Sequence, residues 1–215
     1  MRDGMIENIG NKGLQEEMQI EGAAVLETMQ VETYENTAFL ISEVDEVRVN
    51  ETAAIMAEVF TEDVIANWTE LSTETKSELL NEYYIRAGEN MGIETKGVIV
   101  EPMYAPSGYI MYGYNSEDGY IHINEYVLND PSQLGEVLNT ATHEMRHQLQ
   151  SDVVDNPGAF SDISDEIVET WEYELNHYIS PDYDFQGYCE QAIERDANDF
   201  AENVLEEYQE ELDLK

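Results

Sequence analysis

The amino-acid sequence predicts a single α+β domain. Apolar residues recur at helical spacing in several long segments, which lie on both sides of a stretch where apolar and polar residues alternate as in β-strands. A chain of 215 residues, 42% of them hydrophobic, is long enough to bury a sizeable core. We therefore expect N-terminal helices, a small mixed sheet with a hairpin at its edge, and two further long helices.

The first part of the chain carries few structural signals. Residues 1–20 are polar and show no clear period, so we expect a flexible N-terminal segment ahead of a domain over residues 21–215. The apolar clusters of residues 25–41 fit a strand or a helix equally well. Asn50 has the side chain of a helix N-cap, which predicts a helix over residues 51–60.

A longer helix and a hairpin follow. Ser72 is a good N-cap and Gly92 a good stop signal, so the sequence predicts a helix between them whose apolar stripe packs in the core. Alternating apolar residues begin at Gly97 and continue on both sides of the Asp118-Gly119 turn. This pattern predicts strands between residues 97 and 125, two of them forming a hairpin.

Helices return in the last third of the chain. Asp130 followed by Pro131 starts a long helix that is predicted to run to about Val153. An irregular helical stretch then reaches about Tyr178, and residues 181–187 read as a loop. The last predicted helix covers residues 188–208.

The charge of the chain excludes some partners. It carries 48 acidic and 9 basic residues, for a formal net charge of −39. Direct nucleic-acid binding needs a basic surface, and anionic membranes would repel such a protein. A well-solvated acidic surface or a basic partner fits the composition. The sequence does not specify an oligomeric state.

Cys189 is the single cysteine, so no internal disulfide can form. We expect it to be a small core residue. The N-terminus lacks the apolar stretch of a signal peptide, and no run of 18 apolar residues occurs. The expected location is therefore cytoplasmic, or outside the cell by export without a classical signal peptide.

One pentapeptide, residues 143–147, carries the chemistry. Residues four apart lie on the same side of a helix, so His143 and His147 can converge on one ion. Imidazole pairs of this kind suit Zn²⁺. Glu144 is turned away from direct ligation but can reach a water held by the ion, which is the arrangement needed for peptide hydrolysis.

A helical wheel tests this interpretation. The apolar stripe of the same helix lies about 160–180° from the two histidines. The core side and the metal side are then opposite each other. The alternative is that the histidine side of the helix simply faces water.

A third ligand is needed. Val153 and Gln150 stand where a three-histidine site would place its last histidine and the glycine before it, so that type is excluded. Glu194 lies at the margin of the apolar stripe of the last helix, where a carboxylate is costly unless it is paired or binds a metal. Glu190, one turn earlier, is the main alternative, and Asp196 is a more distant one.

The pentapeptide, followed about 47 residues later by the pattern E-x-x-A-N-x-F-A from Glu194, resembles the gluzincin class of zinc peptidases. It is most similar to ImmA/IrrE-like bacterial or phage-associated metallopeptidases, over residues 97–208. The resemblance implies a zincin-like fold with two metal-bearing helices. It implies His143, His147 and Glu194 as zinc ligands and Glu144 as general base. It also implies that Asn198 can hydrogen-bond a ligand histidine.

The same resemblance implies that strand 120–124 is the edge strand beside the substrate cleft. The helix pair also needs a donor for the tetrahedral oxyanion, and His177, Tyr178 and Tyr188 are candidates. His122 reads as a half-exposed strand residue, and Arg146 as an anchor for an acidic neighbour.

The predicted function is hydrolysis of a protein or peptide by a zinc metallopeptidase. The alternative is a non-catalytic acidic interaction protein, such as a nucleic-acid mimic or an inhibitor of a basic partner.

Overall fold

The computed structural model describes residues 6–8, 43–104, 109–116 and 119–213. The segment of residues 25–41 and most of residues 1–20 lie outside these ranges. The exception near the N-terminus is β1 (Ile6–Asn8), which pairs antiparallel with β3 (Tyr109–Met111).

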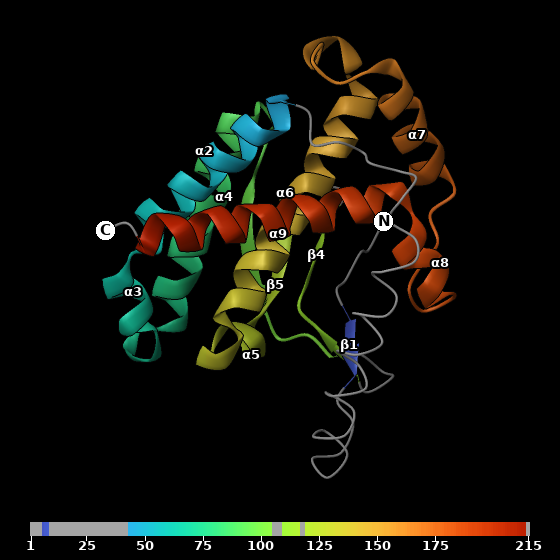
Figure 1. Ribbon diagram of the computed structural model, residues 1–215. Helices are drawn as coiled ribbons and strands as arrows, with labels where there is room; N and C mark the ends of the chain where they lie inside the picture. Colours follow the sequence, from blue (N-terminus) through green and yellow to red (C-terminus); the bar gives the residue numbers. More distant parts are fainter. Residues whose placement is uncertain (1–5, 9–42, 105–108, 117–118, 214–215) are drawn as a thin grey trace.

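The described chain is an α+β structure, as predicted. Its helices are α2 (Glu43–Val59), α3 (Glu62–Ala66), α4 (Thr73–Met91), α5 (Glu125–Leu128), α6 (Leu134–Asp155), α7 (Asp165–Asn176), α8 (Phe185–Glu190) and α9 (Ala192–Asp213). Short 3₁₀ turns cover Trp68–Glu70, Pro131–Gln133 and Pro157–Ala159. Helix α9 crosses α6 and also contacts α2, while α6 touches α4, α7 and the sheet (Figure 1). Helix α6 is therefore the central element of the described fold.

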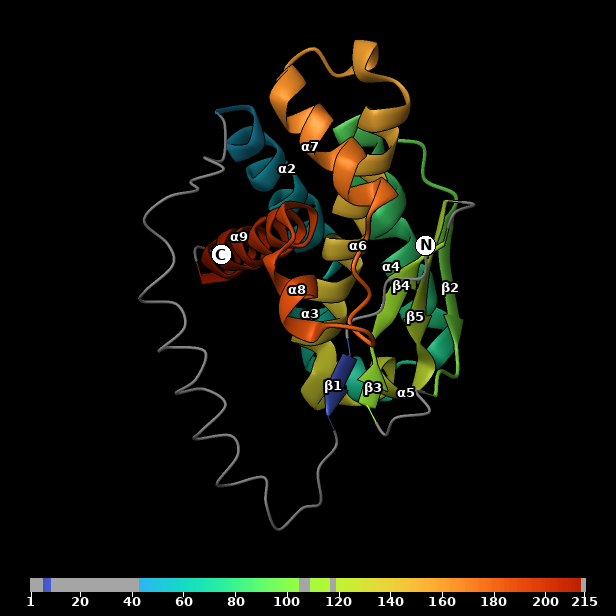
Figure 2. The same ribbon diagram turned by 90° about the vertical axis from the view of Figure 1, so that its right-hand side faces the viewer.

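The sheet that borders α6 has three strands in the order β2-β5-β4. Strand β2 (Gly97–Glu101) runs parallel to β5 (Tyr120–Asn124), and β4 (Gly113–Asn115) runs antiparallel to it. The predicted hairpin is thus confirmed as β4 and β5, and Gly119 supplies the positive φ of 86° at its turn. Figure 2 shows β4 beside α6.

The expectation that residues 120–124 form the edge strand is wrong. Strand β5 is the central strand, and β4 is the edge strand next to α6. The reason is a long-range pairing. Strand β2 comes from the segment after α4 and occupies the outer side of β5, and the local alternation of a hairpin carries no information about that partner.

The predicted ends of α4 are confirmed. The Ser72 hydroxyl accepts a hydrogen bond from the Thr75 N–H at 3.1 Å, and Gly92 closes the helix in the left-handed conformation with a φ of 77°. The buried face of α4 contributes large side chains to the core, as its spacing predicts: Leu80, Tyr83, Tyr84, Ala87 and Met91.

Helix α2 begins earlier than the sequence predicts. Asn50 is an exposed residue inside the helix and not its N-cap, because the helix already starts at Glu43. Val49, Ala53 and Met56 are buried at helical spacing, and α2 packs on α4 and α9. An asparagine costs a helix interior only about 0.7 kcal/mol, which this packing outweighs.

The start of α6 follows the prediction. The Asp130 carboxylate accepts a hydrogen bond from the Ser132 N–H at 3.0 Å, and the turn Pro131–Gln133 leads into the helix. The apolar stripe of α6 is fully or nearly fully buried: Leu138, Ala141, Met145 and Leu149. None of the described helices combines the length and apolar character that crossing a membrane requires.

The few basic residues of the described chain serve mostly internal contacts. Arg48, Lys76 and Arg146 are buried, and Arg86 pairs with the carboxylates of Glu58 and Glu82. Exposed carboxylates therefore have few cationic neighbours. Their mutual repulsion disfavours the compact state until salt screens it.

This repulsion predicts that salt stabilises the protein. Between about 20 mM and about 500 mM NaCl the Debye length falls well below 10 Å, so the repulsion weakens. We expect the Tm to rise by about 4–8 °C, which for a chain of this size corresponds to about 2 kcal/mol. Circular-dichroism melts would measure it, with KCl as the control for a specific sodium effect. An unchanged or falling Tm would contradict the prediction.

Candidate metal centre

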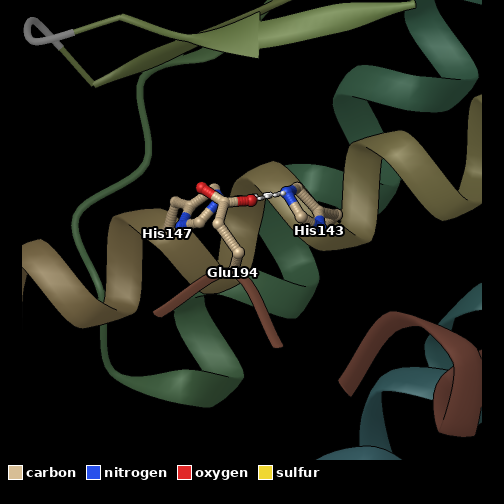
Figure 3. Close-up of side chains that lie close together, drawn as sticks. All are labelled: His143, His147 and Glu194. Atoms are coloured by element: carbon tan, nitrogen blue, oxygen red, sulfur yellow. Dashed lines mark hydrogen bonds and ion pairs between the residues drawn. The ribbon is translucent and has the colours of Figure 1, made fainter. Parts of the chain in front are cut away.

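The two histidines of the pentapeptide lie four residues apart on α6 and point the same way (Figure 3). His143 is 1% and His147 5% exposed, on the side of α6 away from its buried apolar stripe. The alternative of a histidine side facing water is therefore wrong. Burying two imidazoles is unfavourable unless their nitrogens have partners. The Nε2 atoms face Glu194 on α9, and Nδ1 of His147 faces Gln150 on α6.

Glu194 reaches the histidines from the first turn of α9 and is 0% exposed. The last helix does not begin at residue 188, as the spacing suggests, but is divided at Gln191, where the backbone is extended. Gln191 holds the backbone of Ile179 through its side-chain amide, and Glu174 caps the N–H groups of Ala192 and Ile193 at 3.0 and 2.8 Å. These caps come from residues distant in sequence, so local patterns do not predict the break.

The two alternatives to Glu194 lie elsewhere. Glu190 is exposed on α8 and accepts a hydrogen bond from Gln186. Asp196 binds Arg146 in a bidentate ion pair, with N–O distances of 2.8 and 2.7 Å. Within the ranges that the structure describes, His143, His147 and Glu194 are the one group of three or more such side chains that could hold a metal ion.

Two of the three spacings in this group are close to those between the ligands of a tetrahedral ion, and the third is shorter and matches a hydrogen bond between the two imidazoles. Nε2 of His143 lies 2.9 Å from Nε2 of His147 and 3.6 Å from Oε2 of Glu194, and Nε2 of His147 lies 3.5 Å from Oε1 of Glu194. Bonds of about 2.0–2.1 Å to a tetrahedral zinc would set ligand atoms about 3.3–3.4 Å apart. Oε2 of Glu194 is buried and makes no hydrogen bond to the described residues, which is costly unless a ligand meets it.

Electrostatics favours the ionised form of Glu194. Burial acts to raise the pKa of its carboxyl group, but the adjacent imidazoles, His147 before His143, lower that pKa far below its usual range. Glu194 is therefore an anion at neutral pH, which is the form that binds a cation.

Glu144 lies next to this group but belongs to a different set of contacts. Its side chain is fully buried, and its Oε2 accepts a hydrogen bond from the backbone N–H of Asn115 at 2.8 Å. The Asn115 amide also donates to the Glu144 carbonyl at 3.0 Å. The edge strand β4 thus holds both the side chain and the backbone of Glu144 beside the histidines.

Tyr178 is the predicted oxyanion donor that reaches the site. Its hydroxyl donates to Oε1 of Glu194 at 2.9 Å, and its ring packs edge-on against Tyr188 at 6.2 Å. His177 is exposed, stacks on Tyr173 and contacts that residue's carbonyl through Nδ1. The catalytic roles of His177 and Tyr178 remain predictions.

Sequence reasoning missed Gln150 as a partner of the site. Nδ1 of His147 lies 2.7 Å from Oε1 of Gln150, one turn further along α6. The expectation that Asn198 takes this role is wrong, because the described chain gives Asn198 no hydrogen bond to either histidine. The available signal was the i, i+3 spacing from His147 to an amide on a helix side already assigned to metal binding.

Arg146 is an anchor, as predicted. Besides its ion pair with Asp196 it donates to Asp45 of α2 at 3.0 Å, and its guanidinium lies over the rings of Trp171 and Phe200. Burial acts to lower the pKa of Arg146, but the two carboxylates outweigh it and raise that pKa. The cation therefore persists inside the protein.

Two minor predictions have opposite outcomes. His122 is half-buried on β5, stacked on Tyr114 and 2.7 Å from a Glu101 oxygen, which confirms it as a strand residue outside the metal group. Cys189 is exposed, so its assignment to the core is wrong. Helix α8 turns Tyr188 inward, which directs the next residue outward.

Comparison with models of protein families, with curated proteins and with solved structures gives no match for this chain. The chemistry of this chain is therefore inferred from the buried group of His143, His147 and Glu194.

The structure predicts a sharp difference between two glutamates of adjacent helices. Glu194→Gln removes the anionic ligand and should lower the affinity for Zn²⁺ at least 100-fold, because a neutral amide oxygen binds the ion weakly. Glu190→Gln, the matched control on α8, should leave it unchanged. Elemental analysis and competition with a chromophoric chelator would measure both. Equal affinities in the two variants would contradict the assignment of Glu194.

Proposed function

We propose that this protein is a zinc-dependent metallopeptidase of the gluzincin type. The observation that carries the proposal is the buried group of His143, His147 and Glu194 with a further buried carboxylate, Glu144, one residue from the first histidine. Three ligand-type side chains and a separate base are the parts that metal-assisted hydrolysis needs. The order of these residues along the chain agrees with the resemblance to ImmA/IrrE-like peptidases and with a zincin-like fold.

Zinc is the metal that this donor set suits. Two neutral imidazoles and one carboxylate form a borderline-soft site with three protein ligands, which leaves a fourth position for water or substrate. Bound there, zinc supplies a Lewis acid that polarises the scissile carbonyl and acidifies a nearby water.

Glu144 is the proposed general base. Its carboxylate takes a proton from the attacking water as the new C–O bond forms, and passes that proton to the amine nitrogen as the C–N bond breaks. The hydrogen bond from the Asn115 N–H to Oε2 orients this carboxylate. The rigid β4 edge therefore sets the direction from which the base acts.

Tyr178 is the proposed oxyanion donor. Its hydroxyl already lies 2.9 Å from Oε1 of Glu194, within the group. A neutral donor there can stabilise negative charge on the former carbonyl oxygen. His177 has the weaker claim, since its ring contacts Tyr173 instead.

A peptide or protein is the proposed substrate. Among the described strands β4 pairs on one side only, with β5. On its other edge the Asn115 N–H is already bonded to Glu144, and the rest of that edge would pair with the main chain of an extended peptide.

The rival function, a non-catalytic acidic interaction protein, has less support. Surface charge alone would serve such a protein. It would gain nothing from burying two histidines and two glutamates together, which costs folding free energy without a bound cation.

The role of Glu144 predicts loss of activity with retention of the metal. Glu144→Gln keeps the size of the side chain but removes the base, so we expect hydrolysis to fall at least about 10³-fold while one zinc per chain remains. Cleavage of a proteome-derived peptide library, read by mass spectrometry, would measure it. Glu136→Gln, an exposed change on the same helix, is the control. Full activity of the Glu144 variant would refute the mechanism.

Tyr178→Phe tests the oxyanion donor. The change removes one hydroxyl and, with zinc in excess because that hydroxyl also bonds Glu194, should lower kcat by about 10²–10³-fold with little effect on KM. Tyr183→Phe, at an exposed position of the next loop, should be silent. If His177→Ala lowers kcat and Tyr178→Phe does not, the donor is His177.

A further inference from the structure

We infer that Gln150 is a positioning residue that holds His147 in the tautomer able to bind a metal, and that Asp196, Arg146 and Asp45 hold Gln150. The inference rests on the metal-binding part of the proposed function and not on peptidase activity. It follows from which atoms in this chain can donate and which can accept.

The first step is the ion pair between α6 and α9. A guanidinium has donors only, and the Arg146 Nε and Nη2 atoms face the two Asp196 oxygens at 2.8 and 2.7 Å. The third contact, from Nη1 to Asp45 at 3.0 Å, fixes the guanidinium from α2. Asp196 is therefore held in one orientation as an acceptor.

The second step fixes the amide of Gln150. One end of this fully buried side chain faces Oδ2 of Asp196 at 2.7 Å and the carbonyl oxygen of Ile193 at 2.9 Å. Both are acceptors without a proton, so the NH₂ group must lie at this end. The reversed amide would set three oxygens against one another in a buried site. Oε1 of Gln150 must then be the atom that faces His147.

The third step fixes the imidazole. Oε1 of Gln150 can only accept, and it lies 2.7 Å from Nδ1 of His147. Nδ1 therefore carries the proton, and in the neutral ring Nε2 presents a lone pair. Nε2 is the atom that faces His143 and Glu194. The tautomer required for zinc binding is thus set by a chain of contacts that begins at α2.

This series of contacts differs from what the resemblance implies. The hydrogen bond to Nδ1 of His147 comes from Gln150 on α6 and not from Asn198. The series also spans three helices. Asp45 lies on α2, Arg146 and Gln150 on α6, and Asp196 on α9. Full zinc affinity therefore requires that these helices be docked on one another.

The test compares two glutamines of one helix. Gln150→Ala removes the acceptor of the His147 Nδ1 proton, and the loss of such a partner typically lowers metal affinity about 10–100-fold. Gln148→Ala is the matched control, because Gln148 is half-buried and bonded to Asp152 and Asn115 instead. Zn²⁺ affinity would be measured by chelator competition, with far-ultraviolet circular dichroism to verify folding. An unchanged affinity in folded Gln150→Ala would overturn the inference.

A second measurement needs no substitution. Long-range ¹H–¹⁵N spectra of the wild-type protein distinguish the two tautomers of a neutral imidazole, with and without zinc. We expect the proton of His147 on Nδ1 in both states, and a proton on Nε2 without metal would overturn the inference. A wild-type protein that binds no zinc would refute the metal centre instead. If the protein binds zinc, and binds it more weakly without Gln150, but cleaves no peptide, only the proposed peptidase activity is refuted.

Discussion

The buried ion pair between Arg146 and Asp196 is the interaction on which the rest of this structure depends. It joins α6 to α9 where the two helices cross, and Asp45 extends it to α2. A buried pair of this kind adds little net stability, because desolvation offsets its attraction, but loss of one partner typically costs about 3–5 kcal/mol. The ion pair instead fixes how α6 and α9 are positioned along and around each other, because sliding or rotating either helix would leave a buried charge unpaired. That arrangement brings Glu194 of α9 opposite the two histidines of α6.

Helix α6 is unusual in being buried on both sides for different reasons. One side carries an apolar stripe that packs into the core, and the other carries His143, Glu144 and His147. The polar side is kept in place by directed contacts, from Gln150 to one histidine and from Asn115 to the glutamate. These contacts offset part of the desolvation cost, and a bound cation would offset more. A core of this kind favours a ligand, because the buried Oε2 of Glu194 makes no hydrogen bond to the described residues.

The few basic side chains of the described chain are used mainly for contacts inside the fold. The chain has 9 basic residues against 48 acidic ones. Arg48, Lys76 and Arg146 are buried in contact with other groups. The solvent-facing side chains of the described residues are therefore strongly acidic. A buried bidentate arginine fixes the register of two helices, whereas the ion pairs of a surface arginine are screened by salt and water.

Local chemistry in the sequence was enough to predict several parts of this protein. The Ser72 and Gly92 ends of α4, the hairpin of β4 and β5, and the pairing of His143 with His147 all depend on residues a few positions apart. The sequence also narrowed the third ligand to Glu194, Glu190 or Asp196. Only the tertiary structure brings Glu194, and not Glu190 or Asp196, next to the histidines. It also pairs β2 with β5, starts α2 at Glu43 and divides the last helix at Gln191. Each of these features depends on a residue distant along the chain, such as Glu174, which caps α9, or Arg146, which pairs with Asp196. The hydrophobic period of a segment shows which of its sides is buried, but not which other segment packs against that side.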